Sequence, residues 1–230
     1  MDASRKTAVI VGVLFIVATV ASMLGQGILG SVLDDPDYLI NISENKTRVI
    51  IGVLISFIDG IAIAGIAVLM FPILKKYNEG IALGYVGARI AELPIIVAYL
   101  IIPLLLTDLS QEYVKAGAPA ASYFQTSGTL FFAVRHWTIQ MVYIFNFIAG
   151  LMFCYLLYKS KLVPRFISIL GLVGYSVMLP GTLLHIFGQI GTNQIFIIFA
   201  LGILFEILLP IWLFIKGFSS SAIASKSVKQ

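Results

Sequence analysis

Long apolar runs alternate with short polar segments along this chain. Six of the runs are long enough to cross the hydrocarbon core of a bilayer, which takes about 20 apolar residues in an α-helix. They cover residues 8–29, 49–74, 81–106, 138–158, 166–187 and 194–215. The pattern predicts an all-α fold: a polytopic transmembrane helical bundle with six spans, forming a single transmembrane domain over residues 1–230.

The first run also resembles a signal peptide, because it follows the basic residues Arg5 and Lys6. The apolar core of a signal peptide is usually about 7–15 residues long, and this run is longer. We therefore interpret residues 8–29 as the first membrane span.

Two of the polar segments between the apolar runs are longer than the others. Residues 34–47 are expected to form a loop, with Pro36 as a breaker. Residues 107–137 are expected to form an outer loop that Gly117-Ala118-Pro119 divides. Within that loop, Phe124 to Val134 is apolar enough to predict a short interfacial or re-entrant helix.

Composition agrees with a membrane protein and excludes several other classes. Of the 230 residues, 60% are hydrophobic and 11% are charged, whereas about 25% are charged in soluble domains. The net charge of +4 reflects basic loops, so nucleic acid is not an expected partner. The single cysteine, Cys154, excludes a disulfide framework and a cysteine metal site. The lipid bilayer is the expected surrounding, and no cofactor is expected.

The positive charges predict an orientation. With both termini in the cytoplasm, ten of the 15 lysines and arginines fall on inner segments and four on outer ones, while Arg89 lies within a span. The inner ones are Arg5, Lys6, Lys75, Lys76, Lys159, Lys161, Arg165, Lys216, Lys226 and Lys229. This positive-inside asymmetry indicates cytoplasmic termini and a multi-pass protein of the cell membrane.

Several polar side chains fall near the middle of the spans. A charge at that depth costs a few kcal/mol on insertion scales, so these side chains should face the bundle interior. The candidate ligand-binding or ion-binding residues are Asp59, Tyr85, Arg89, Glu92, Asn146 and Glu206. Arg89 and Glu92 share a helix face because they are three residues apart, and Arg89 is expected to pair with Asp59, Glu92 or Glu206.

Three acids against one arginine favour a polar pocket over a simple salt bridge, because full ionisation would leave excess negative charge in lipid. One acid should then hold a proton. We therefore predict a transporter-like or sensor-like protein that binds a small ligand, a cation or a proton. The alternative for the same residues is a neutralised ion cluster that only fixes helix register.

Two other functional classes stay open. An intramembrane enzyme could use the central acids, or His136 and His185, which both lie near the predicted outer face and could hold a metal. No tight ligand spacing, nucleophile motif or phosphate-binding loop accompanies them, so an enzyme is the less favoured class. A structural or regulatory partner of another membrane protein would need no ligand at all.

Two stretches resemble a known family. One runs from Leu69 to Lys76 and then from Gly84 to Glu92, and it includes the sequence Arg89-Ile90-Ala91-Glu92. The other runs from Tyr155 through Lys159-Ser160 and Pro164-Arg165 to Tyr175. Both are similar to a prokaryotic integral membrane family known as domain of unknown function 4386, over roughly residues 48–188. The resemblance implies a bacterial or archaeal cell membrane and no particular activity.

Overall fold

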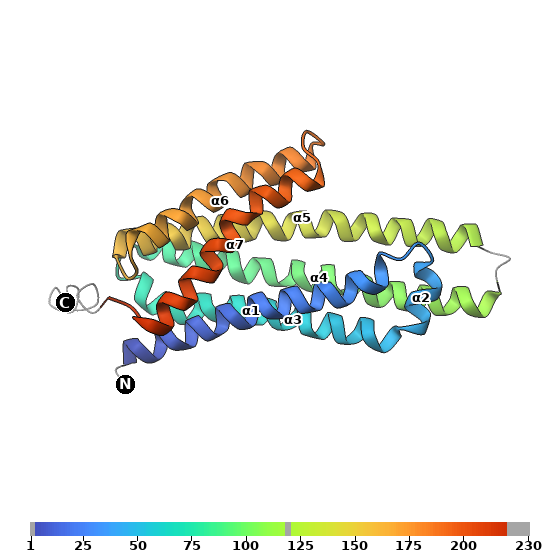
Figure 1. Ribbon diagram of the computed structural model, residues 1–230, viewed down its shortest axis with the longest axis horizontal. Helices are drawn as coiled ribbons and strands as arrows, with labels where there is room; N and C mark the ends of the chain where they lie inside the picture. The colour runs from blue at the N-terminus through green and yellow to red at the C-terminus, as the bar shows by residue number, and fades with distance from the viewer. Residues whose placement is uncertain (1–2, 118–120, 220–230) are drawn as a thin grey trace. The chain divides into compact units, whose positions relative to one another are not determined.

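The computed structural model describes residues 3–117 and 121–219, and every regular element in them is an α-helix. Figure 1 shows the helices in chain order, coloured from blue to red. They are α1 (Ala3–Leu33), α2 (Tyr38–Glu44), α3 (Lys46–Leu74), α4 (Glu79–Ala116), α5 (Ala121–Ser160), α6 (Arg165–Ile186) and α7 (Thr192–Ile215).

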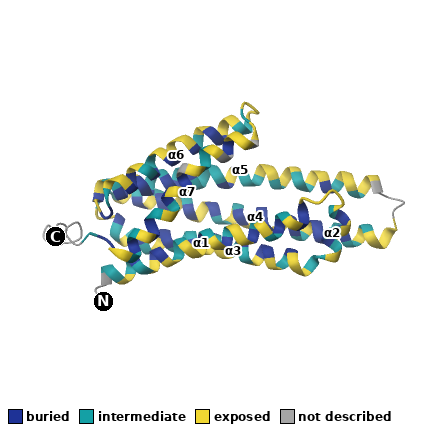
Figure 2. Ribbon diagram, viewed as in Figure 1, coloured by how far each residue is buried: buried dark blue, intermediate teal, exposed yellow. Residues whose placement is uncertain are grey.

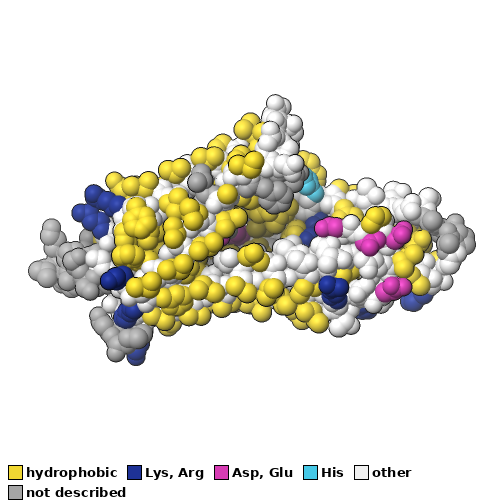
Figure 3. Space-filling model, viewed as in Figure 1, with side chains coloured by type: hydrophobic (Ala, Val, Ile, Leu, Met, Phe, Trp, Pro, Cys, Tyr) yellow, Lys and Arg dark blue, Asp and Glu magenta, His cyan; other side chains and the backbone are white. Residues whose placement is uncertain are grey.

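Six of these helices, all except α2, are long and apolar enough to cross a membrane. This confirms the predicted all-α bundle with six spans. Buried and exposed positions alternate along each helix (Figure 2). Figure 3 shows hydrophobic side chains over much of the visible face, and many of the exposed large hydrophobic residues are isoleucine, leucine or valine. Apolar side chains on the outside are what a helix needs where it faces lipid.

The described residues of the predicted outer loop, 107–117 and 121–137, are helical almost throughout, so the loop is shorter than predicted and the helix expected at 124–134 is part of α5. Helix α4 continues to Ala116, and α5 already begins at Ala121. Residues 107–116 contain no glycine or proline, and the Thr107 hydroxyl donates to the carbonyl of Pro103 at 2.9 Å. Polar residues can extend a helix beyond the apolar run, so hydropathy alone ended both helices too early. Gly117 follows α4 with a φ of 62°, a conformation that favours glycine, and residues 118–120 lie outside the described part.

The predicted loop at residues 34–47 is also corrected, because it contains α2. The Asn41 side chain donates to the carbonyl of Val32 at 3.1 Å, and Ile42 is fully buried. The ring of Tyr38 packs edge-on against Phe132, 5.0 Å away between centroids. A short helix is marginal alone, so these tertiary contacts, which the sequence does not reveal, hold α2 in place.

The helices form two compact units. Unit 1 comprises Met1–Val17, Ala62–Glu92 and Tyr143–Gln230, apart from residues 1–2 and 220–230, which are not described. Unit 2 comprises Ala18–Ile61 and Leu93–Val142, with residues 118–120 not described. Helices α1, α3, α4 and α5 contribute residues to both units.

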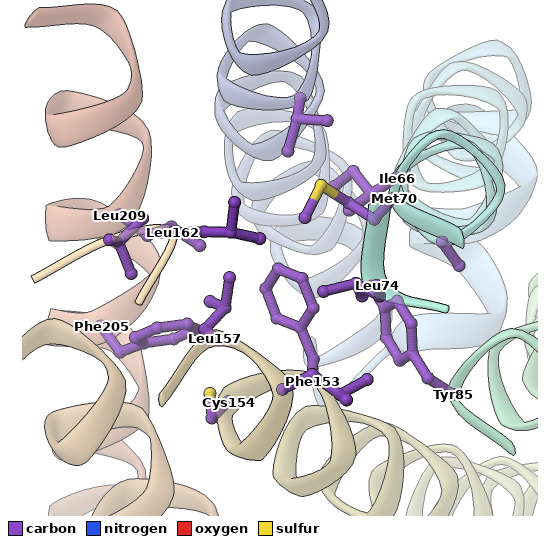
Figure 4. Close-up of a cluster of buried hydrophobic side chains, with 14 of the residues drawn as sticks. Ile66, Met70, Leu74, Tyr85, Phe153, Cys154, Leu157, Leu162, Phe205 and Leu209 are labelled. Atoms are coloured by element: carbon purple, nitrogen blue, oxygen red, sulfur yellow. The ribbon is translucent and has the colours of Figure 1, made fainter. Parts of the chain in front are cut away.

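Unit 1 has its own hydrophobic core (Figure 4). The rings of Tyr85 and Phe153 stack at 5.1 Å within it, and Met70, Leu157 and Phe205 are also buried there. Helices α6 and α7 pack against each other. Their approach depends on small residues, since a Cβ added to Gly171 would collide with Cys154 and Phe205.

Unit 2 has a separate core. Its fully buried centre includes Leu29, Ile42, Val49 and Leu106. The Ser110 hydroxyl donates to the carbonyl of Leu39, which ties α4 to α2.

Candidate functional site

Arg89 and Glu92 form a buried ion pair in unit 1. They lie one turn apart on α4, and Nη1 of Arg89 is 2.8 Å from Oε2 of Glu92. Arg89 is 8% exposed and Glu92 is 1% exposed. Both belong to the part of α4 that lies in unit 1, so the pair fits the prediction that Arg89 meets an acid inside the bundle.

Further polar groups surround this pair. Asn146 of α5 donates from its side-chain amide to Oε1 of Glu92 at 3.3 Å, so both carboxyl oxygens of Glu92 have a partner. The Arg89 guanidinium lies 6.0 Å from the ring centroid of Tyr85, close enough for a cation–π interaction. The Nε atom of Arg89 is buried without a hydrogen-bond partner among the described residues.

A second carboxyl lies nearby. Tyr175 of α6 donates its hydroxyl to Oε1 of Glu206 on α7 at 3.1 Å. Glu206 is partly buried and lies within electrostatic range of both Arg89 and Glu92. We call the set Tyr85, Arg89, Glu92, Asn146, Tyr175 and Glu206 the Arg89 cluster. Its six residues come from α4, α5, α6 and α7, and all six belong to unit 1.

A polar stripe on α6 continues from the cluster. Ser168, Tyr175 and Thr182 are spaced seven residues apart, so they share one helix face. The hydroxyls of Ser168 and Thr182 are buried and have no hydrogen-bond partner within the described chain. A buried polar group costs free energy unless it is hydrogen-bonded. Ser168 and Thr182 lie 14 residues apart, about 21 Å along the helix, so a single small molecule can reach at most one of these two hydroxyls.

The structure thus brings together five of the six predicted site residues. Tyr85, Arg89, Glu92, Asn146 and Glu206 all belong to unit 1. Asp59 is partly buried in α3 and belongs to unit 2.

The two histidines also belong to different units. His136 lies in unit 2, where its ring packs edge-on against Trp137 at 5.3 Å. His185 lies in unit 1, and its Nδ1 is 3.0 Å from the carbonyl oxygen of Ile190. Among the described residues, no group of three or more His, Cys, Asp or Glu side chains is arranged to hold a metal ion.

Unit 2 contains a polar cluster that the sequence interpretation missed. Its hub is Gln26 of α1, whose Oε1 accepts from the Tyr99 hydroxyl at 2.8 Å and from Nη2 of Arg135 at 2.9 Å. The guanidinium of Arg135 also stacks on the Tyr99 ring, 4.4 Å from its centroid. Ser56 accepts from Nε2 of Gln26 at 3.4 Å. The usable signal was Gln26 itself, a polar amide between Gly25 and Gly27 in an apolar run.

Comparison with known proteins gives a family and no characterised relative. No curated protein and no solved structure matches the chain significantly. One family model does match, over residues 10–217, which covers every member of the Arg89 cluster. The chain therefore belongs to the family described as "Domain of unknown function (DUF4386)".

Proposed function

We propose that the Arg89 cluster is a binding site within a multi-pass membrane protein, of the kind found in transporters and sensors. In this proposal a carboxyl of the cluster takes up a proton, and Nε of Arg89, which has no partner among the described residues, donates a hydrogen bond to a small polar ligand or ion. The observation that carries the proposal is the buried ion pair of Arg89 with Glu92, within electrostatic range of a second acid, Glu206, on another helix.

The charge balance of the cluster supports a proton site. Arg89 supplies one positive charge, and Glu92 and Glu206 would supply two negative charges if both were ionised. Glu92 has the direct ion pair with Arg89, whereas the hydrogen-bond partner of Glu206 is a neutral tyrosine hydroxyl. An uncompensated charge inside a membrane is costly. A proton on Glu206 avoids this cost, because the cluster then carries one positive and one negative charge and is neutral.

The unused hydrogen-bonding groups support a ligand. A cluster that served only to lock helices together would satisfy each buried polar atom, because partly satisfied buried networks are unfavourable. Here Nε of Arg89 is left over within the cluster, and the hydroxyls of Ser168 and Thr182 are left over about two turns to either side of Tyr175 on α6. Small residues also pack helices closely in lipid without any charge, and unit 1 already uses Gly171 in this way.

The positive charges support a location in the cell membrane with both termini in the cytoplasm. Eight of the ten cations assigned to inner segments lie in the described part of unit 1, and Lys226 and Lys229 lie outside the described residues. The four assigned to outer segments, Lys46, Arg48, Lys115 and Arg135, all belong to unit 2.

Infrared spectroscopy across a pH series tests the proton site. The parent protein should show a protonated-carboxyl band that changes with pH, and Glu206→Gln should remove it while Glu92→Gln leaves it. Tyr175→Phe is a matched control, because it keeps the carboxyl and removes only its hydrogen-bond donor; it should shift the band rather than abolish it. The absence of any titrating carboxyl between mildly acidic and mildly basic pH would contradict the proposal.

A further inference from the structure

Unit 1 contains a cavity that the Arg89 cluster does not use. It has a volume of about 500 Å³ and lies between the turn that joins α5 to α6 and the end of α7. Lys161, Arg165 and Lys216 line it, and all three side chains are exposed. Among the described residues that line the cavity, none is acidic. The cavity therefore presents concentrated positive charge.

Apolar and aromatic side chains form the rest of the cavity lining. Trp212 is partly buried at the last turn of α7, and Leu162 and Phe218 are buried. Trp is enriched where a membrane meets water, because its ring is amphipathic. The cavity also lies where two candidate spans end, since α6 begins at Arg165 and α7 ends at Ile215. Figure 3 shows dark-blue basic side chains near these helix ends, next to a yellow hydrophobic surface.

The walls of the cavity are fixed by hydrogen bonds. The backbone N–H of Ser219 donates to the carbonyl of Leu162 at 2.9 Å, which joins the two walls. Nη2 of Arg5 donates to the carbonyl of Phe214 at 2.6 Å. Gly217, with a φ of 72°, leaves room for the Arg5 guanidinium, since a Cβ there would lie 2.6 Å from Nη1. The pocket is therefore preformed, which lowers the cost of binding.

From these observations we propose that the cavity binds the phosphate headgroup of an anionic phospholipid. The three cations pair with the phosphate, and Trp212 with the buried Leu162 and Phe218 contacts the glycerol and upper acyl chains. Basic pockets between transmembrane helices bind anionic lipid headgroups in this manner. Residues 220–230 include two lysines and no acidic side chain, so no side chain of that segment supplies the anion.

Three cations could also bind a free phosphate ion. The position and the lining of the cavity favour the phosphate of a phospholipid over a free phosphate. The cavity lies at the ends of candidate spans and combines charge with buried apolar side chains. A soluble phosphate would use only the cations, whereas a phospholipid uses both parts of the lining.

Native mass spectrometry of the full-length protein tests this proposal with dioleoyl phosphatidylglycerol as the probe and dioleoyl phosphatidylcholine as the neutral lipid. The parent protein should bind the anionic lipid preferentially. The double variant Lys161→Gln/Lys216→Gln should bind it at least tenfold more weakly, since each cation near the membrane surface contributes about fivefold. Arg165→Gln, a second change in the lining, should weaken binding about fivefold.

The matched control is Lys75→Gln/Lys76→Gln, which removes the same charge from another exposed basic turn of unit 1 that does not line the cavity. It should bind the lipid as the parent does. Equal weakening in both double variants, or parent-like binding by the cavity variants, would overturn the proposal. Displacement of the lipid by inorganic phosphate at constant ionic strength would show a soluble phosphate site and would overturn the lipid assignment.

Discussion

Nη1 of Arg89 lies 2.8 Å from Oε2 of Glu92, one helical turn away on α4, and both side chains are buried. The same helix contains a second pair with the same spacing and the same distance, Lys115 with Glu112. Those two side chains are 71% and 63% exposed. The helix thus provides a buried pair and an exposed pair with the same spacing and the same distance, although the acid and the base follow in opposite order along the chain.

Replacing Arg89 by alanine should destabilise the protein strongly. The change leaves Glu92 buried without its cation, and breaking a buried pair in this way costs about 3–5 kcal/mol. Lys115→Ala should leave the unfolding free energy unchanged, because exposed pairs contribute little. Reversible denaturation in detergent micelles measures both variants. Equal stability of Arg89→Ala and the parent would show that Arg89 is not held in a buried pair.

Alanine substitutions at two glycines of unit 1, Gly150 and Gly87, should change the stability of the protein in opposite directions. A Cβ on Gly150 would lie 2.6 Å from the ring of Tyr175, whereas a Cβ on Gly87 would meet nothing within 4 Å. Gly150→Ala should therefore lose about 1–3 kcal/mol through overpacking. Gly87→Ala should gain up to about 1 kcal/mol, because alanine favours a helix interior. Thermal unfolding of the two variants checks the difference, and similar melting temperatures would contradict the close approach of Gly150 on α5 to Tyr175 on α6.

The Gln26 cluster should contribute to the stability of unit 2. Gln26→Leu removes the acceptor for both Tyr99 and Arg135 in this part-buried network, and leaving a buried donor unpaired costs about 1–3 kcal/mol. Ser31→Ala on the same helix is the control, because that exposed hydroxyl donates to the carbonyl of Ile28 within α1 itself. Denaturation should separate the two variants; a Gln26→Leu protein as stable as Ser31→Ala would show that the hub is dispensable.

The proposed orientation can be tested by labelling with a thiol reagent that does not cross membranes. Cys154 is fully buried, so the parent protein should remain unlabelled. Asp35→Cys and Glu112→Cys, both at exposed positions, should react in intact cells. Lys76→Cys, also exposed, should react only after the membrane is permeabilised. Reaction at position 76 in intact cells would reverse or exclude this topology.

The sequence predicted the spans better than their ends. Apolar runs located all six long helices, because a helix in lipid must satisfy its own backbone and must present apolar side chains. The runs did not reveal that α4 extends to Ala116 or that α5 begins at Ala121. Those extensions use polar residues, which hydropathy cannot distinguish from a loop.

The candidate site was partly predictable for the same reason. Arg89 and Glu92 were evident as charges three residues apart in an apolar run, and their pairing follows from helix geometry. The partner of Glu206 was not evident, because Tyr175 is far from it in sequence and only the packing of α6 on α7 brings them together. Gln26 was overlooked because an uncharged amide perturbs an apolar run much less than a charge does.

Proton exchange at Glu206 tests the central claim most directly. The purified protein would be transferred from H₂O to D₂O at a pH where the carboxyl band assigned by Glu206→Gln is present, and infrared spectra would follow that band over time. A binding site that takes up a proton from its surroundings predicts that the band shifts to the deuterated position within minutes. A band that stays at its H₂O position for as long as the protein remains folded would contradict the account and would indicate a sealed, purely structural cluster.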